Sequence, residues 1–491
     1  MKHTKLSDHS FEKGVFITPL NSLQMMTELE DGKSWIYGRM PEYLWIGLVM
    51  KYYGHDEGLK KSCQIISKLH KLAPALYTAR MSQILRLEPD VQRQFYTYIL
   101  SICTKEMLAP LTVFLTSSRA PIFAEYFCCP DHSIEDRSKE LMATMHGVTD
   151  QHSEEASDIR FIALYFNFIS GKLHLQRKQV DLLHVYLTAN HDDELMNMAR
   201  RTVCSIEMMI LTFEKVDSTY LIEFWRSISE MTDCNMFAIK FPKENRNITA
   251  YMEKLYDVFE YLTELFKSTD PLNEKMNVLL GIATYSYNRL KEIYEYQLFN
   301  SISGRSCVRV LIEDYIMMKY LVKSEASNES IWREYQLYGM GLYKLVLARY
   351  REYGVPGEHH FDEKYIEALV NEFKNEEIIN MDTTYFNKHN VRLKAEAIGE
   401  KNLYGLYYDY DSSFEHGLWG AIRESSLLKC DNPAHNYHCI PDINGETRLK
   451  TVLPDCIMIM NKTVSFLDEI YGIPKSLLDE VVNFEIKPII E

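Results

Sequence analysis

Several catalytic motifs that mark common classes of large enzyme are missing from this sequence. It contains no phosphate-binding G-x-x-x-x-G-K-[ST] loop, no H-E-x-x-H pair, no G-x-S-x-G nucleophile turn and no C-x-x-C pair. Their absence excludes P-loop nucleotide hydrolases, zinc proteases of the H-E-x-x-H type, hydrolases with a nucleophile turn and C-x-x-C redox proteins. A function has to be sought in less common combinations of residues.

Long apolar segments are also missing. No stretch offers the roughly 20 uninterrupted apolar residues that a membrane span needs, and the N-terminal residues MKHTKLSDHSFEKG lack the apolar run of a secretory signal. The 10 cysteines are scattered along 491 residues, which is typical of reduced thiols rather than of a disulfide framework. We therefore expect a cytoplasmic protein with reduced cysteines and no membrane partner.

Glycine and proline are few, with 20 and 15 residues in the whole chain. Leu, Met, Glu, Lys and Tyr are abundant, and this balance favours helices over strands and turns. The formal net charge of −15 excludes a protein whose whole surface attracts nucleic-acid phosphates, so any RNA site has to be local. The composition predicts an all-α fold.

Apolar residues recur at helical spacings through most of the chain. The segment FPKENRN at 241–247 interrupts this pattern with Pro, charge and Asn, as linkers between domains do. We therefore predict a helical N-terminal module over residues 1–240 and a helical bundle over residues 241–491. The clearest expected helices are 57–72, 91–108, 133–147 and 156–171 in the module, and 250–268, 274–299, 304–321 and 329–354 in the bundle.

One predicted helix, Gly304–Leu321, is apolar almost all round and yet carries three charges in one row. Arg305, Arg309 and Glu313 are spaced by four residues, so they form a stripe along one face. Charges on a buried helix are unfavourable unless they are paired or used. The stripe is either a structural ion-pair ladder or the floor of a functional site. We predict that Arg309 and Glu313 form a direct ion pair at the wall of a cleft.

A later segment, SSFEHGLWGAIRES at 412–425, holds further candidate site residues on a helix expected near 412–428. Ser412 or Ser413 can cap the start of this helix. His416 can exchange a proton near neutral pH, and on a helix it would share a face with Arg423. His416 is therefore either a general acid or base, or a hydrogen-bonded structural residue.

The loop that follows, CDNPAHNYHC at 430–439, has the ligand types of a zinc site without a standard spacing. Its candidates are Cys430, His435, His438 and Cys439. The adjacent His438 and Cys439 can hardly both reach one tetrahedral ion, so we predict no metal bound jointly by these four residues. His435 and His438 would then either hydrogen-bond neighbouring helices or contact a substrate phosphate.

Three of these features follow one another in the second half of the chain. They are a helix that opens Gly304-Arg305-Ser306 and continues through Arg309 and Glu313, then Ser413 and His416 in a Tyr-rich segment, then the loop Asn432-Pro433-Ala434-His435. This order resembles the prokaryotic DUF5677 family over residues 250–491. That family is uncharacterised as a whole and is similar in turn to the HEPN class of helical domains, which includes RNA-cleaving toxins and antiviral effectors that act as dimers.

The resemblance implies a metal-independent ribonuclease of HEPN type that needs no cofactor. Arg305 and Arg309 would hold the scissile phosphate, Glu313 would orient one of them, and His416 would be the general acid or base. HEPN nucleases take Arg and His from one R-x4–6-H motif, whereas here they would come from different helices. The N-terminal module would sense a trigger or bind a partner protein, and the active form would be a homo-oligomer. The residues expected to contact the RNA are Ser413, Arg423, His435 and His438.

Two alternatives stay open. A non-catalytic scaffold or regulatory protein would use the Arg/Glu stripe and His416 as a buried polar network that fixes helix order. A metal-dependent hydrolase would use His416, His435 and His438. The net acidity favours the scaffold, whereas the Tyr and His rings of the second half can stack on unpaired bases and favour an RNA site.

Overall fold

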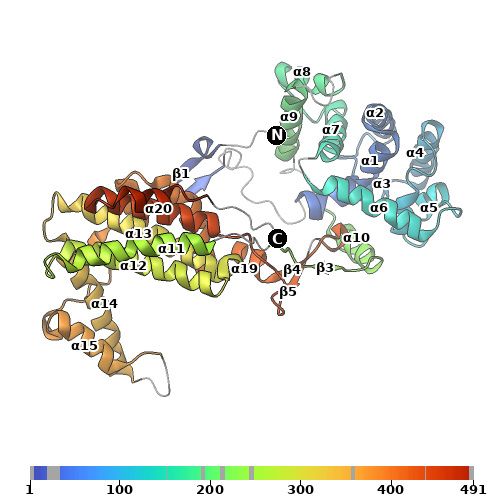
Figure 1. The fold of residues 1–491 in the computed structure, drawn as a ribbon. Coiled ribbons are helices and arrows are strands. Elements are labelled where there is room, and N and C mark those ends of the chain that lie inside the picture. The colour runs from blue at the N-terminus through green and yellow to red at the C-terminus, as the bar shows by residue number, and fades with distance from the viewer. Residues whose placement is uncertain are drawn as a thin grey trace. The chain divides into compact units, whose positions relative to one another are not determined.

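The computed structural model describes residues 5–18, 34–151, 153–188, 194–210, 216–242, 248–354, 360–436 and 438–485. Helices make up most of these residues, and strands form only two short sheets (Figure 1). The predicted all-α class is therefore confirmed. None of the helices in these ranges combines the length and the apolar character that a membrane span requires.

The chain divides into two compact units. The first unit contains residues 1–236 and 430–438, and the second contains residues 237–429 and 439–491. The sequence predicted one boundary after residue 240, in a linker of which residues 243–247 lie outside the described part of the chain. Nothing in the sequence pattern marks residues 430–438 as part of the first unit.

The first unit is a helical module in which α1 (Met40–Tyr53) is buried along most of its length. Pro41 stands in the first turn, where a missing backbone N–H is tolerated, and Gly54 ends the helix with a φ of +76°. Gly47 lets α7 approach closely, because a Cβ there would lie 3.1 Å from Cδ1 of Ile159. The other elements of this unit include β1 (Ser10–Glu12) and β2 (Val15–Ile17), which pair antiparallel, and α2 (His55–Leu72), α3 (Met81–Ile84), α4 (Pro89–Ile102), η5 (Ala109–Val113), α5 (Pro121–Phe127), α6 (Ile134–Thr149), α7 (Glu154–Ile169), α8 (Arg177–Tyr186), α9 (Glu194–Ile210), α10 (Ser218–Glu230) and the 3-10 turn η11 (Pro433–His435).

Two buried arginines of the first unit share one carboxylate. Arg39 forms an ion pair with Glu207, and Nε of Arg160 lies 3.7 Å from Oε2 of the same carboxylate. Both guanidinium groups also lie against the Trp35 ring, 5.3 and 4.5 Å from its centroid. One carboxylate and one ring thus accommodate two buried cations, and this ties η4 (Trp35–Arg39) to α7 and α9.

The second unit is a bundle around α13 (Ile302–Glu325), which contains the predicted helix 304–321 and packs against α12, α16, α18 and α20. The Ser301 side chain caps α13 by accepting the Gly304 N–H at 3.2 Å. A Cβ at Gly304 would lie 2.7 Å from the Leu298 carbonyl oxygen, so the chain needs glycine here. The other helices include α11 (Ile248–Lys267), α12 (Glu274–Glu295), η7 (Leu298–Asn300), α14 (Ile331–Tyr353), α15 (Glu363–Phe373), η8 (Glu376–Ile378), η9 (Phe386–Lys388), α16 (Val391–Ala397), α17 (Lys401–Leu403), η10 (Tyr404–Tyr408), α18 (Asp409–Glu415), α19 (Trp419–Ser425), α20 (Leu453–Tyr471) and α21 (Lys475–Val482).

Two of the predicted helices have the wrong extent. The helix expected over 91–108 ends at Ile102, because Cys103 adopts an extended backbone. The helix expected near 412–428 is interrupted at Gly417, whose φ of +55° separates α18 from α19. The last residues of the expected helix instead begin the strand β4 (Leu427–Cys430). This strand lies between β3 (Met236–Phe237) and β5 (Cys439–Pro441) in a three-stranded sheet, and it pairs antiparallel with β5.

Candidate functional site

Arg305, at the start of the predicted stripe, is enclosed within the second unit and is only 5% exposed. Its Nη2 donates a hydrogen bond to the Lys450 carbonyl at 2.8 Å, and its Nε lies 4.0 Å from Oδ1 of Asp411. The guanidinium also lies 5.7 Å from the ring centroids of both Tyr410 and Phe414. Protein groups therefore satisfy much of this cation's charge.

Two carboxyl groups flank this arginine. Asp411 on α18 is 3% exposed, and burial raises its pKa to about 7 although Arg305 acts in the opposite direction. Burial likewise raises the pKa of Asp455, in the first turn of α20, and Arg305 again opposes the shift. Arg305 thus links three helices, α13, α18 and α20, through charge.

Arg309 lies one turn further along α13 and is more accessible, with its side chain 22% exposed. Its Nη2 donates to the Tyr408 hydroxyl at 3.2 Å and lies 3.9 Å from Oε2 of Glu313, so the predicted ion pair is present.

Glu313 also acts on Lys394 of α16, whose amine is buried. Burial lowers the pKa of Lys394 to about 8, against the pull of Glu313. No local sequence pattern identifies Lys394 as a candidate site residue.

His416 does not share a helical face with Arg423, contrary to the prediction. His416 follows the last residue of α18 and is exposed, and Gly417 turns the chain before α19, which carries the exposed Arg423. The Ser413 hydroxyl donates to the Tyr410 carbonyl at 2.6 Å, a bond within its own helix. In the described part of the chain no hydrogen bond or ion pair joins His416 to either predicted arginine.

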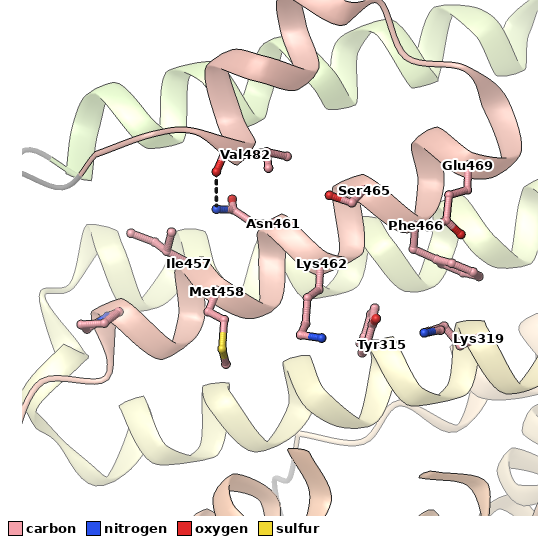
Figure 2. A pocket seen from close by; sticks show the side chains of 11 residues that line it. Tyr315, Lys319, Ile457, Met458, Asn461, Lys462, Ser465, Phe466, Glu469 and Val482 are labelled. Carbon is pink, nitrogen blue, oxygen red and sulfur yellow. Dashed lines mark hydrogen bonds between the residues drawn. The ribbon is translucent and has the colours of Figure 1, made fainter. Parts of the chain in front are cut away.

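An open cavity of about 510 Å³ lies in the second unit between α13 and α20 (Figure 2). Lys319 comes from α13 and Lys462 from α20, and both approach the carboxylate of Glu400, with Nζ to Oε1 distances of 3.3 and 3.5 Å. The Tyr315 hydroxyl donates to the same oxygen at 3.1 Å. Burial opposes ionisation of Glu400, but Lys462, Tyr315 and Lys319 together hold its pKa below the usual value. The remaining lining residues are Pro454, Ile457, Met458, Asn461, Ser465, Phe466, Glu469 and Val482.

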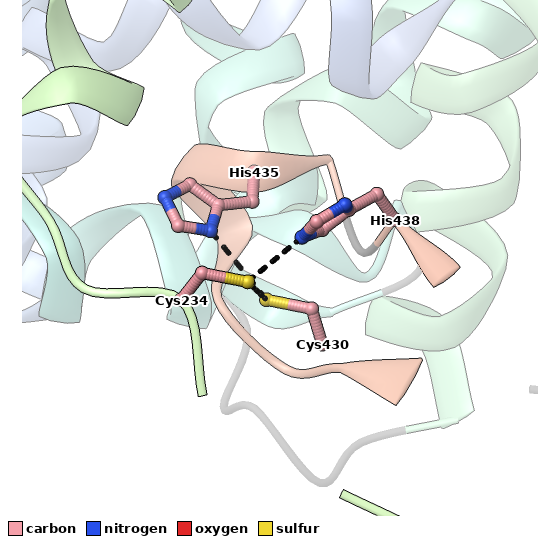
Figure 3. Close-up of side chains that lie close together, drawn as sticks. All are labelled: Cys234, Cys430, His435 and His438. Carbon is pink, nitrogen blue, oxygen red and sulfur yellow. Dashed lines mark hydrogen bonds between the residues drawn. The ribbon is translucent and has the colours of Figure 1, made fainter. Parts of the chain in front are cut away.

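His435 and His438 belong to the first unit, whereas Arg305 and Arg309 belong to the second. They are grouped with Cys430 and with Cys234, a residue that the sequence analysis did not consider (Figure 3). The ligand atoms of these four side chains all lie within 4.8 Å of one another. Cys439, the fourth candidate in the sequence, is not part of the group. The strain expected from adjacent ligands at 438 and 439 therefore does not arise.

The sequence did not reveal a second arrangement in the first unit, beside a cavity of about 380 Å³ that His55 and Asp158 line. Nδ1 of His55 lies 2.8 Å from Oδ2 of Asp158, and the Tyr186 hydroxyl donates to Oδ1 of the same carboxylate at 2.6 Å. A buried carboxylate of this kind fixes the orientation of an imidazole. The three residues come from different parts of the chain, so no spacing connects them.

The comparison with known families concerns mainly the second unit. Residues 276–435 match the model of DUF5677, a family of unknown function. Neither a curated protein nor a solved structure matches the chain. The match begins in α12 and includes α13, Asp411 and the loop as far as His435. The predicted family resemblance is thus supported for this part of the chain.

Proposed function

We propose that the second unit is a non-catalytic regulatory module that binds a small anionic ligand in the cavity between α13 and α20. The observation that carries this proposal is the convergence of Lys319 and Lys462 on the single carboxylate of Glu400. Glu469 also lines this cavity, so the two lysines face two carboxylates, and a ligand phosphate or carboxylate would bind by taking over lysine contacts from Glu400.

The surroundings of Arg305 support the non-catalytic part of the proposal. This arginine is the first candidate for holding a phosphate, yet it is enclosed by Asp411, the Lys450 carbonyl and two aromatic rings. A buried polar network with these contacts fixes the order of helices. Such a network is what the scaffold or regulatory alternative requires, except that Asp411, and not His416, is the partner of the arginine.

The walls of the cavity indicate the kind of ligand. Ile457, Met458 and Phe466 provide apolar surface, and Asn461 and Ser465 provide hydrogen-bonding groups. The volume falls within the range of about 300 to 1,000 Å³ that is common for small-molecule sites. A nucleoside monophosphate has both a phosphate for the lysines and a flat base for the apolar wall, and is the probe of choice.

Calorimetric titration of the full chain with adenosine monophosphate and with inorganic phosphate tests this proposal. We expect saturable binding of the nucleotide to the wild type and at least a tenfold loss of affinity in the double variant Lys319→Gln/Lys462→Gln. The control variant Lys254→Gln/Lys267→Gln removes two lysines that lie outside the cavity and pair with other glutamates, and it should bind like the wild type. Equal binding by all three proteins, or no binding of either probe, would contradict the proposal.

A second candidate function is the metal-independent ribonuclease of HEPN type. The accessibility of Arg309 favours it, because a partly exposed guanidinium beside the Tyr408 hydroxyl can reach a phosphate. The exposed His416 of the same unit would be the acid or base. Under this second candidate function, the substrate is RNA and the active form is a homo-oligomer. The first unit would bind a trigger or a partner protein.

Incubation with total cellular RNA in the presence of a chelator tests the ribonuclease. Cleavage by the wild type that is lost in Arg309→Ala and in His416→Ala, but kept in His360→Ala, would support it. His360 is the control because it is an exposed histidine of the same unit outside the predicted site. Intact RNA with every protein would leave the ligand-binding module as the remaining proposal.

A further inference from the structure

The four side chains of Cys234, Cys430, His435 and His438 have the geometry of a metal centre (Figure 3). The two Sγ atoms lie 3.9 Å apart, Sγ of Cys234 lies 3.0 Å from Nε2 of His438, and Sγ of Cys430 lies 3.6 Å from Nδ1 of His435. Zinc bound to sulfur at about 2.3 Å and to nitrogen at about 2.0 Å in tetrahedral geometry separates its ligand atoms by roughly 3.3 to 3.8 Å. We infer that these residues form a structural zinc site.

The hydrogen bonds of His435 provide independent evidence. Its Nε2 lies 3.2 Å from the Ser229 carbonyl oxygen and 3.1 Å from the Thr232 hydroxyl. A carbonyl only accepts, so Nε2 carries the proton and Nδ1 presents its lone pair on the side of Cys430. Histidines that bind metals are characteristically oriented by donating their other ring N–H to a carbonyl or carboxylate.

The types and number of the four ligand atoms indicate which metal ion binds and whether the site is structural or catalytic. Two thiolates and two imidazoles suit zinc, whereas calcium and magnesium require oxygen ligands. Four protein ligands complete the tetrahedron, so no position remains for a catalytic water. This group differs from the alternative of a metal-dependent hydrolase with His416, His435 and His438, because it contains Cys234 and Cys430 and not His416.

The proposed zinc ion would attach a returning segment of the chain. Residues 430–438 stand between two stretches of the second unit in sequence, but belong to the first unit. Ala434 of this segment is 1% exposed in the core of the first unit, and the Asn432 side chain donates to the Asp233 carbonyl at 3.1 Å. Zinc would join this segment to Cys234, which follows α10, across 196 residues of sequence.

Metal analysis of the full chain tests the inference. The protein is unfolded with reductant and chelator, refolded with a small excess of zinc chloride, desalted and measured by plasma mass spectrometry. We expect one zinc per chain in the wild type and in Cys439→Ser. Cys439 is the matched control, because it is the neighbour of His438 but is not a ligand. The variants Cys234→Ser and His438→Ala should lose at least nine tenths of the zinc.

A second measurement keeps the inference testable where a variant fails to fold. Wild-type protein refolded with cobalt chloride should show the intense visible absorption of tetrahedral cobalt with thiolate ligands, and zinc should abolish it stoichiometrically. Substoichiometric zinc in the reduced wild type, or a full equivalent of zinc in Cys234→Ser, would overturn the site. A thiol titration that shows Cys234 and Cys430 joined as a disulfide in the refolded protein would overturn it as well.

Discussion

Arg305 on α13 and Asp411 on α18 face each other inside the second unit, with 4.0 Å between Nε and Oδ1. Both residues are at least 95% buried, and Asp455 of α20 adds a second carboxyl group to the same environment. One buried cation therefore faces two carboxyl groups whose pKa values burial raises. This relationship makes the stability of the second unit depend on Arg305 and on pH.

Replacing Arg305 by Met should destabilise the protein by about 3 kcal/mol or more, because it leaves buried carboxyl groups without their cation. Urea unfolding followed by circular dichroism measures the effect. Arg423→Met, at an exposed arginine of α19, is the control and should change the free energy of unfolding by no more than about 0.5 kcal/mol. A similar small change in both variants would show that Arg305 is not structural.

The stability of the protein should fall as the pH rises from about 5 to about 7. Burial raises the pKa of both Asp411 and Asp314 to about 7, so in this window the folded chain holds protons that the unfolded chain has released. Asp411→Asn imitates the protonated form and should remove part of this slope. The free energy of unfolding at pH 5, 6 and 7 measures it, and an unchanged slope in the variant would contradict the prediction.

Gly304 and Gly281 form a matched pair of helical glycines. A Cβ at Gly304 would lie 2.7 Å from a backbone carbonyl, so Gly304→Ala should destabilise the protein by about 1 to 3 kcal/mol. No heavy atom lies within 4 Å of a Cβ at Gly281 of α12, so Gly281→Ala should stabilise it by up to about 1 kcal/mol. Melting temperatures of the two variants should move in opposite directions.

Removing the Tyr186 hydroxyl should weaken the core of the first unit. Tyr186→Phe keeps the ring stacked on Phe161 but loses the hydrogen bond to the Asp158 carboxylate. Bonds to charged groups contribute about 1.5 to 3 kcal/mol, so a loss of that size is expected. Tyr285→Phe, at an exposed tyrosine of the second unit, should leave the unfolding free energy unchanged.

The fold class and the central helix could be predicted because they depend on local information. Spacings of three and four between apolar residues predicted an all-α chain, and the helix expected over 304–321 lies within α13. The Arg309–Glu313 pair could also be predicted, since both residues belong to one helix. The same spacing predicted helices that were too long at Cys103 and Gly417, because the backbone torsion of each of these residues ends a helix.

By itself, the sequence determined the helices, their apolar faces and the stripe of charge on α13, because each depends on neighbours a few residues away. Only the tertiary structure decided that Arg305 is enclosed while Arg309 is accessible, since that difference depends on α18 and α20. It also decided that Cys234, and not Cys439, joins Cys430, His435 and His438. Residues 196 positions apart meet only when the core of the first unit folds, and no local spacing records that contact.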